Sequence, residues 1–264
     1  MSEETAATGG PVDTREQTDR DAVDEGDPES VNELYVVHSE PDPESTYHSD
    51  ALASWFPEAT PIDFVHGERV PLDRATGVVL TGSTAGVYEA DDRPWIADQA
   101  ALVRELVDRS IPTLGVCFGH QIVNAALGGT VEPVGTTAAL VEAGLAEDPL
   151  FDGVAPVVVS LHGDAVTEVG EGLSVVASAD HAPVFGTRHQ TAPVWTVQFH
   201  PEIGAHHRET LVDRFAWDER DHTFADVTRG RVFENFRRLV DEHHTEARAT
   251  ETGRVAGSPG EQSL

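Results

Sequence analysis

Three side chains in this sequence have the types and surroundings that hydrolysis of an amide requires. Cys117, the only cysteine, lies in the segment GVCFGHQ at 115–121, while His200 and Glu202 lie in QFHPE at 198–202. A cysteine that attacks a carbonyl carbon needs an imidazole to carry its proton and an acid to orient that imidazole. The combination predicts a cysteine nucleophile assisted by a His–Glu pair.

The position of Cys117 between glycines is typical of a nucleophile elbow. An apolar run at 111–116 precedes it and a helical pattern, QIVNAAL, follows it. In such an elbow a sharp strand-to-helix turn lifts the reactive atom above a sheet. The N-terminal amides of the helix stabilise an anion, which favours the reactive thiolate. The same residues also fit a buried cysteine in a glycine-rich turn, so the elbow alone leaves both interpretations open.

The partner segment makes the catalytic interpretation more specific. His200 follows an apolar strand, Pro201 ends that strand, and Glu202 stands where we expect the next helix to begin. The imidazole and the carboxylate can therefore meet at a strand end. A His-Pro-Glu segment after an aromatic residue, paired with the elbow 83 residues upstream, is a more specific signal than either motif alone.

With these motifs the chain resembles the class I, or triad-type, glutamine amidotransferases over residues 33–241. Two weaker stretches support the resemblance, TGSTAGVY at 81–88 and SLHGDAV at 160–166. It implies that Cys117 attacks the side-chain amide of glutamine to form a γ-glutamyl thioester. His200 would pass a proton to the departing ammonia and then activate water, and Glu202 would orient His200.

The resemblance also implies where the substrate is held. The backbone N–H groups of Phe118 and Ser83 would form the oxyanion hole, and Gln121 together with the backbone of Gly163 and Asp164 would bind the amino-acid end of glutamine.

The sequence departs from the family pattern at two places. Gly82-Ser-Thr84 stands where many members have two glycines or Gly-Pro, and residues 134–139 carry no acid where members have a glutamate-glycine element. The second departure leaves the identity of the substrate open: it is free glutamine or another compound.

The elements that must position these residues alternate between strand and helix. We expect strands at 33–38, 62–65, 77–80 and 111–116, the end of a helix at 51–56, and helices at 94–109, 202–215 and 229–243. Alternation of this kind predicts an α/β protein with an open, mostly parallel sheet and helices on both faces. The resemblance implies the flavodoxin-like amidotransferase fold. Segments at 154–160, 173–179, 182–187 and 194–197 are expected as added edge strands.

The two ends of the chain are predicted to lie outside the folded domain. Residues 1–32 carry ten acids against two arginines, a net of −8, and few large apolar residues, so we expect a disordered acidic tail. The amidotransferase domain is expected at 33–244 and a second disordered tail at 245–264.

The charge is strongly negative throughout. The formal net charge is −30, and all 17 basic residues are arginine. Self-repulsion of this size weakens a compact state in dilute buffer and is screened at ~1 M salt. The composition indicates a halophilic protein of a salt-rich cytoplasm, with an acidic mesophilic protein as the alternative. It disfavours nucleic acid as a partner, and no apolar run reaches the length of a membrane span.

We expect no cofactor and no metal. The pairs His206-His207 and His243-His244 point in different directions on a helix and lack a third ligand in the sequence pattern. His120 is expected to pack or to support the fold. His162 and Asp164 could form a second acid–base pair, although a loop that shapes the pocket through its backbone fits them better.

Three functions compete. The first is a stand-alone subunit, resembling the glutaminase domain of GMP synthetase, that releases ammonia for a synthetase on a separate polypeptide, since little sequence follows the last helix. The second is an independent hydrolase of γ-glutamyl compounds, because the thioester chemistry is the same. The third, a sensor or scaffold without activity, is disfavoured by the intact Cys117, His200 and Glu202.

Overall fold

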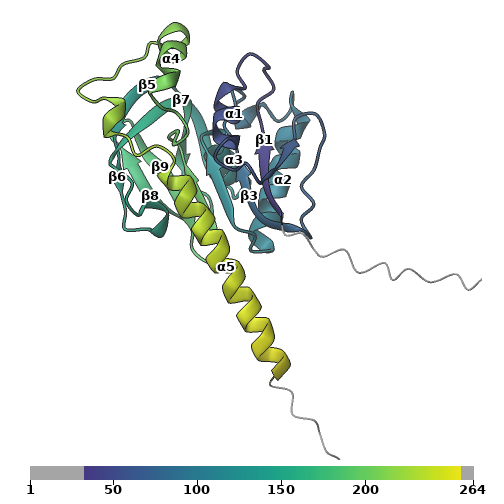
Figure 1. Cartoon of the computed structure of the whole chain (residues 1–264). Coiled ribbons are helices and arrows are strands. Elements are labelled where there is room, and N and C mark those ends of the chain that lie inside the picture. The colour runs from purple at the N-terminus through teal and green to yellow at the C-terminus, as the bar shows by residue number, and fades with distance from the viewer. Residues whose placement is uncertain (1–32, 257–264) are drawn as a thin grey trace, which may run out of the picture. The chain divides into compact units, whose positions relative to one another are not determined.

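A computed structural model describes residues 33–256, and its centre is an eight-stranded sheet of order β2-β1-β3-β4-β10-β9-β8-β6 (Figure 1). The first five strands are parallel: β2 (Thr60–Asp63), β1 (Glu33–His38), β3 (Ala75–Leu80), β4 (Thr113–Val116) and β10 (Val194–Val197). The other three are antiparallel: β9 (Ala182–His189), β8 (Leu173–Ala179) and β6 (Gly144–Leu145). The parallel part has the strand order of flavodoxin-like folds, which confirms the predicted fold class.

Successive side chains along each strand point to opposite faces of the sheet, and both faces are buried. On one face Val36, Val79 and Leu114 pack with α1 (Tyr47–Ala53) and α5 (Arg231–Ala256). On the other face the neighbouring residues of β1 and β3 pack with α2 (Pro94–Asp108) and α3 (Phe118–Ala126). Burial on both sides is the usual state of a parallel sheet.

The remaining strands form a separate antiparallel ribbon. It consists of β5 (Thr130–Glu142) and β7 (Val157–Glu168), and it packs on Ile203 and on Leu211 of α4 (Arg208–Arg214). Short 3₁₀ turns complete the described chain: η1 (Val87–Glu89), η2 (Pro149–Phe151), η3 (Ala205–His207) and η4 (Phe224–Asp226).

Two of the four expected edge strands lie elsewhere. β8 and β9 do extend one edge of the sheet, but β7 belongs to the ribbon and β10 lies inside the sheet, between β4 and β9. All four residues of β10 are buried. A four-residue apolar segment has the same sequence pattern at an edge and in the interior, and its position is decided by its neighbours.

Two helix boundaries also differ from expectation. The helix predicted from Glu202 begins at Arg208, because residues 201–202 form a turn and Gly204 is extended. α5 continues to Ala256, so the expected disordered tail from Thr245 is wrong over 245–256, where alanine, glutamate and arginine favour helix and no proline intervenes. The expected tail at 1–32 and residues 257–264 lie outside the described residues. Among the described helices, none is long and apolar enough to cross a membrane.

Candidate active site

The predicted catalytic residues meet at the carboxyl ends of adjacent parallel strands. Cys117 follows β4, His200 comes shortly after β10, and the loop 82–84 follows β3. Since β4 lies between β3 and β10, all three segments reach the same edge of the sheet. The backbone N–H of Cys117 donates to the carbonyl of Val197, the last residue of β10, at 2.9 Å.

The turn at Cys117 has the geometry of an elbow. Cys117 has φ 54° and ψ −105°, a left-handed conformation that costs energy for any residue with a side chain. A Cβ on Gly115 would collide with the carbonyl of Gly119, and a Cβ on Gly119 would collide with the carbonyl of Leu80. The two glycines therefore allow α3 to start directly against β3 and β4, with Cys117 at its first turn.

His200 is placed between two acceptors. Its Nδ1 lies 2.6 Å from Oε1 of Glu202, and its Nε2 lies 3.1 Å from the carbonyl oxygen of Leu161. The same carbonyl lies 3.8 Å from Sγ of Cys117, so it contacts both the imidazole and the thiol. Because a carboxylate and a carbonyl can only accept, both ring nitrogens donate in this arrangement. The site thus suits an imidazolium beside the sulfur.

The electrostatics agree with the geometry. Burial lowers the pKa of His200, but the negative charges of Glu202 and Cys117 outweigh burial and hold that pKa well above 6.5. His200 is 3% exposed and Glu202 is 1% exposed, so solvent screens their interaction little. The second carboxylate oxygen of Glu202 is buried and has no partner in the described part of the chain.

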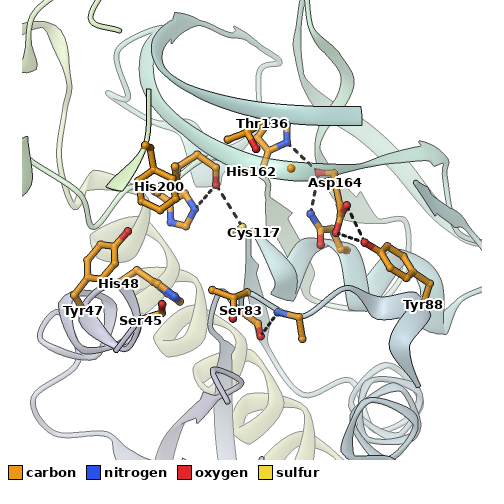
Figure 2. A pocket seen from close by; sticks show the side chains of 16 residues that line it. Ser45, Tyr47, His48, Ser83, Tyr88, Cys117, Thr136, His162, Asp164 and His200 are labelled. Atoms are coloured by element: carbon orange, nitrogen blue, oxygen red, sulfur yellow. Dashed lines mark hydrogen bonds between the residues drawn. The ribbon is translucent and has the colours of Figure 1, made fainter. Parts of the chain in front are cut away.

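Above Cys117 lies a cavity of about 330 Å³, in the range of small-molecule sites. Its lining includes six of the eight predicted site residues: Ser83, Cys117, Gln121, Gly163, Asp164 and His200. Tyr88, Thr136 and Asp164 lie on one side of Cys117, and Ser45, Tyr47 and His48 lie on the other, beside His200 (Figure 2). The cavity therefore extends from Cys117 in both directions.

On the side of Asp164 the cavity wall is polar, and hydrogen bonds hold its side chains in place. The Gln121 side chain donates to the backbone carbonyl of Asp164 (3.0 Å) and to Oε1 of Gln198 (3.1 Å). The Asp164 carboxylate accepts from the Tyr88 hydroxyl at 3.3 Å, and its burial raises its pKa. Asp164 and Gln121 thus hold one another at the cavity wall.

The two predicted oxyanion donors differ in position. Ser83 lines the cavity, and its backbone N–H donates to no acceptor in the described residues, whereas the N–H groups of Thr84 and Ala85 are occupied by Glu40 and by the Ser83 hydroxyl. The ring of Phe118 is buried in the core, and its backbone N–H begins α3 without an acceptor in the described chain. Neither amide is engaged by an acceptor among the described residues, and of the two residues only Ser83 lines the cavity.

Burial lowers the pKa of three other histidines near the site, His120, His162 and His181. His162 does not pair with the Asp164 carboxylate: its Nδ1 donates to the Asp164 backbone carbonyl (2.9 Å), and its Nε2 lies 3.2 Å from Nε2 of His181. Burial lowers the pKa of His162 to about 4 and that of His120 to about 3. His120 lies in the core, 2.7 Å from the Thr196 hydroxyl. These contacts fit supporting roles for all three.

Residues 33–249, whose side chains are described, contain no group of three or more side chains suited to a metal ion.

A second acid–imidazole pair, not among the residues predicted from the sequence, lies beside the cavity. Glu40 and His48 come from the loop after β1 and from α1, and they lie 3.1 Å apart between Oε2 and Nε2. The available signal was an acidic residue directly after a buried strand, at the edge where the other strands end.

Solved structures with a similar fold include glutamine amidotransferases. A glutamine amidotransferase from Thermotoga maritima superimposes with a TM-score of 0.64 at 20% identity, over 79% of this chain and 98% of that one. A protein from Thermoplasma acidophilum, described as a putative component of GMP synthase, gives 0.59 at 20% identity, over 83% and 98%. At this identity the likeness establishes the fold, which is that of the glutamine amidotransferases.

The sequence establishes the family. Residues 55–218 match the family model of class-I glutamine amidotransferases, so the chain belongs to that family. Glutamine-hydrolysing GMP synthases are similar to it. That of Lactobacillus delbrueckii subsp. bulgaricus is 32% identical over 160 residues, 58% of this chain and 30% of that protein. That of Gibberella zeae is 34% identical over 152 residues, 54% and 26%. The chain thus spans about a third or less of the length of these relatives.

Proposed function

We propose that the protein hydrolyses the side-chain amide of glutamine through a γ-glutamyl thioester on Cys117. In the first half, the sulfur attacks the amide carbon, and the resulting oxyanion accepts hydrogen bonds from the backbone amides of Phe118 and Ser83. His200 then gives its Nε2 proton to the departing nitrogen, and the C–N bond breaks to release ammonia.

In the second half, water attacks the thioester carbon and His200 takes a proton from it. The C–S bond breaks, glutamate leaves, and Cys117 and His200 return to their starting state. Glu202 keeps the imidazole in one orientation and stabilises its positive charge during both halves. Gln121 and the backbone of Gly163 and Asp164 bind the amino-acid end of the substrate.

The observation that carries this proposal is the chain of contacts from Glu202 through His200 to the Leu161 carbonyl and Cys117. It supplies a nucleophile, a proton carrier and an orienting carboxylate in one buried line. A role as a sensor or scaffold would require none of the three.

We further propose that the ammonia serves a synthetase on a separate polypeptide. The similarity to GMP synthases, and to the putative GMP synthase component of Thermoplasma acidophilum, supports this partner. With a net charge of −30 we expect activity to require molar salt in the cytoplasm of a halophile.

A second candidate is hydrolysis of a γ-glutamyl compound with a larger amine. The cavity continues past His200, the proton donor to the leaving group in the proposed reaction, to Tyr47, His48 and Phe215. Residue 136 is a threonine rather than an acid. Such a leaving group has room there.

One assay separates the candidates. Ammonia release from glutamine and cleavage of a γ-glutamyl dipeptide are measured in ~2 M KCl for wild type and Cys117→Ala, with and without extract of salt-grown cells. Glutamine turnover that rises with extract supports the role as a synthetase subunit. Dipeptide cleavage alone supports the hydrolase. Absence of both activities, or activity that survives Cys117→Ala, would overturn the proposed chemistry.

A further inference from the structure

The Glu40 carboxylate, outside the catalytic line, is bound to the loop that carries Ser83. Oε2 of Glu40 accepts from the backbone N–H of Thr84 at 2.7 Å, and Oε1 accepts from the Thr84 hydroxyl at 2.7 Å. Oε1 also accepts from the backbone N–H of Asp42 at 2.8 Å. One carboxylate therefore ties the loop after β3 to the loop after β1.

This carboxylate is buried and fully used. The Glu40 side chain is 1% exposed, and its fourth contact is Nε2 of His48 at 3.1 Å. Burial alone would raise its pKa, but the hydrogen bonds from His48, Thr84 and Asp42 lower the pKa below its ordinary value. Glu40 is thus ionised at neutral pH, and charge-assisted hydrogen bonds of this kind are the stronger ones.

His48 extends the contact to the catalytic histidine. Its ring meets the ring of His200 edge to face with centroids 6.3 Å apart, and its Nδ1 would lie 3.2 Å from a Cβ at Gly82. In Figure 2 His48 and Ser83 lie on the same side of the cavity, below Cys117 and His200. The Glu40–His48 pair therefore borders both the catalytic histidine and the loop that carries Ser83.

We propose that Glu40 is a positioning residue, which holds the 82–84 loop so that the free backbone N–H of Ser83 faces the oxyanion of the bound substrate. The hydrogen bonds to Thr84 turn the N–H and the hydroxyl of that residue toward β1. The neighbouring Ser83 amide is left for the substrate. The proposal rests on the proposed thioester chemistry, because only that reaction creates an oxyanion at this place.

Glu40→Gln tests the proposal with almost no change in shape. One carboxylate oxygen faces the N–H of Asp42 and the other faces the N–H of Thr84. Whichever oxygen becomes an NH₂ group, it meets a backbone donor, and no rotamer restores all contacts. Thr84→Val removes the hydroxyl contact alone, and Thr84→Ser restores it. Glu105→Gln on the exposed face of α2 is the matched control.

Loss of one oxyanion donor costs roughly 10²–10³ in kcat. We expect Glu40→Gln, which displaces that donor, to lower kcat for glutamine at least tenfold with KM within about threefold. Thr84→Val should lower kcat less, and Thr84→Ser and Glu105→Gln should match wild type. Alkylation of Cys117 by iodoacetamide should stay within twofold, because the Cys117–His200–Glu202 line is untouched. Amide hydrogen exchange of the peptide containing residues 81–85 should become faster in Glu40→Gln.

A Glu40→Gln enzyme with wild-type kcat and unchanged exchange at 81–85 would overturn the proposal. So would parallel losses in kcat and in alkylation, since these indicate collapse of the whole site. If Glu40→Gln does not fold, the comparison of Thr84→Val with Thr84→Ser gives the same decision. If wild type does not turn over glutamine, the proposed function fails, while hydrogen exchange still tests whether Glu40 holds the loop.

Discussion

Replacing Glu202 by glutamine removes the negative charge that stabilises the His200 imidazolium. The shape of the residue 202 side chain stays nearly the same. At the effective permittivity of ~20 typical of proteins, unit charges ~4 Å apart interact by about 4 kcal/mol. Since about 1.4 kcal/mol corresponds to a factor of ten, the equilibrium constant for protonation of His200 should fall roughly a thousandfold. The buried second oxygen of Glu202 would become an NH₂ group with no acceptor among the described residues, which adds to the loss.

The expected result is a loss of roughly 10³ in kcat for glutamine, with slower alkylation of Cys117 at pH 7. The assay is steady-state ammonia release in molar salt, together with iodoacetamide labelling followed by mass spectrometry. Glu209→Gln, an exposed residue of α4, is the control and should match wild type. A Glu202→Gln enzyme within tenfold of wild-type kcat would refute the reasoning.

The same change has a pH signature. The pKa of His200 in the folded protein is raised, so the stability that the His200–Glu202 pair contributes is complete below pH 6.5 and is lost as the pH rises through the folded value. Glu202→Gln should therefore destabilise the protein more at pH 6 than at pH 9.5. A loss of stability that is independent of pH contradicts an imidazolium at His200.

Three further predictions concern stability. Gly119→Ala should destabilise the protein by roughly 1–3 kcal/mol or more in chemical denaturation, because its Cβ meets the backbone of Leu80, and wild-type stability would show that α3 can shift. The free energy of unfolding of wild type should fall between pH 6 and 4, because His120 takes up a proton only in the unfolded state. His120→Gln should make this fall less steep by up to about 1.4 kcal/mol per pH unit. An unchanged slope would contradict a neutral His120 in the folded protein. Thermal unfolding should move to higher temperature between 0.1 and 2 M KCl, because ~3 Å screening at molar salt removes the repulsion of a −30 chain, and a midpoint that does not rise contradicts this account of the charge.

The sequence predicts the parallel sheet because its strands are short apolar runs with helical periods between them. The motif around Cys117 locates the elbow because Gly115 and Gly119 lie where the backbone of the turn makes contacts too close for a Cβ. The order of the elements, and the position of each residue at the end of a strand, were thus enough to predict that Cys117 and His200 lie close together.

Contacts that depend on tertiary packing were not predictable in the same way. Nothing local distinguishes β10 inside the sheet from a strand at its edge, and nothing local connects Glu40 with Thr84 across 44 residues. The carbonyl of Leu161 between Cys117 and His200 is a backbone group, and no residue type marks it. These features come from how segments distant in sequence pack.

The covalent intermediate is the most direct test of the central claim. Wild type and Cys117→Ser are mixed with glutamine in molar salt, quenched in acid within the first turnovers and analysed by intact-protein and peptide mass spectrometry. The account predicts a γ-glutamyl adduct on the peptide containing Cys117 in wild type and no such thioester in Cys117→Ser. Ammonia release by wild type without any adduct, together with equal release by Cys117→Ser, would contradict it.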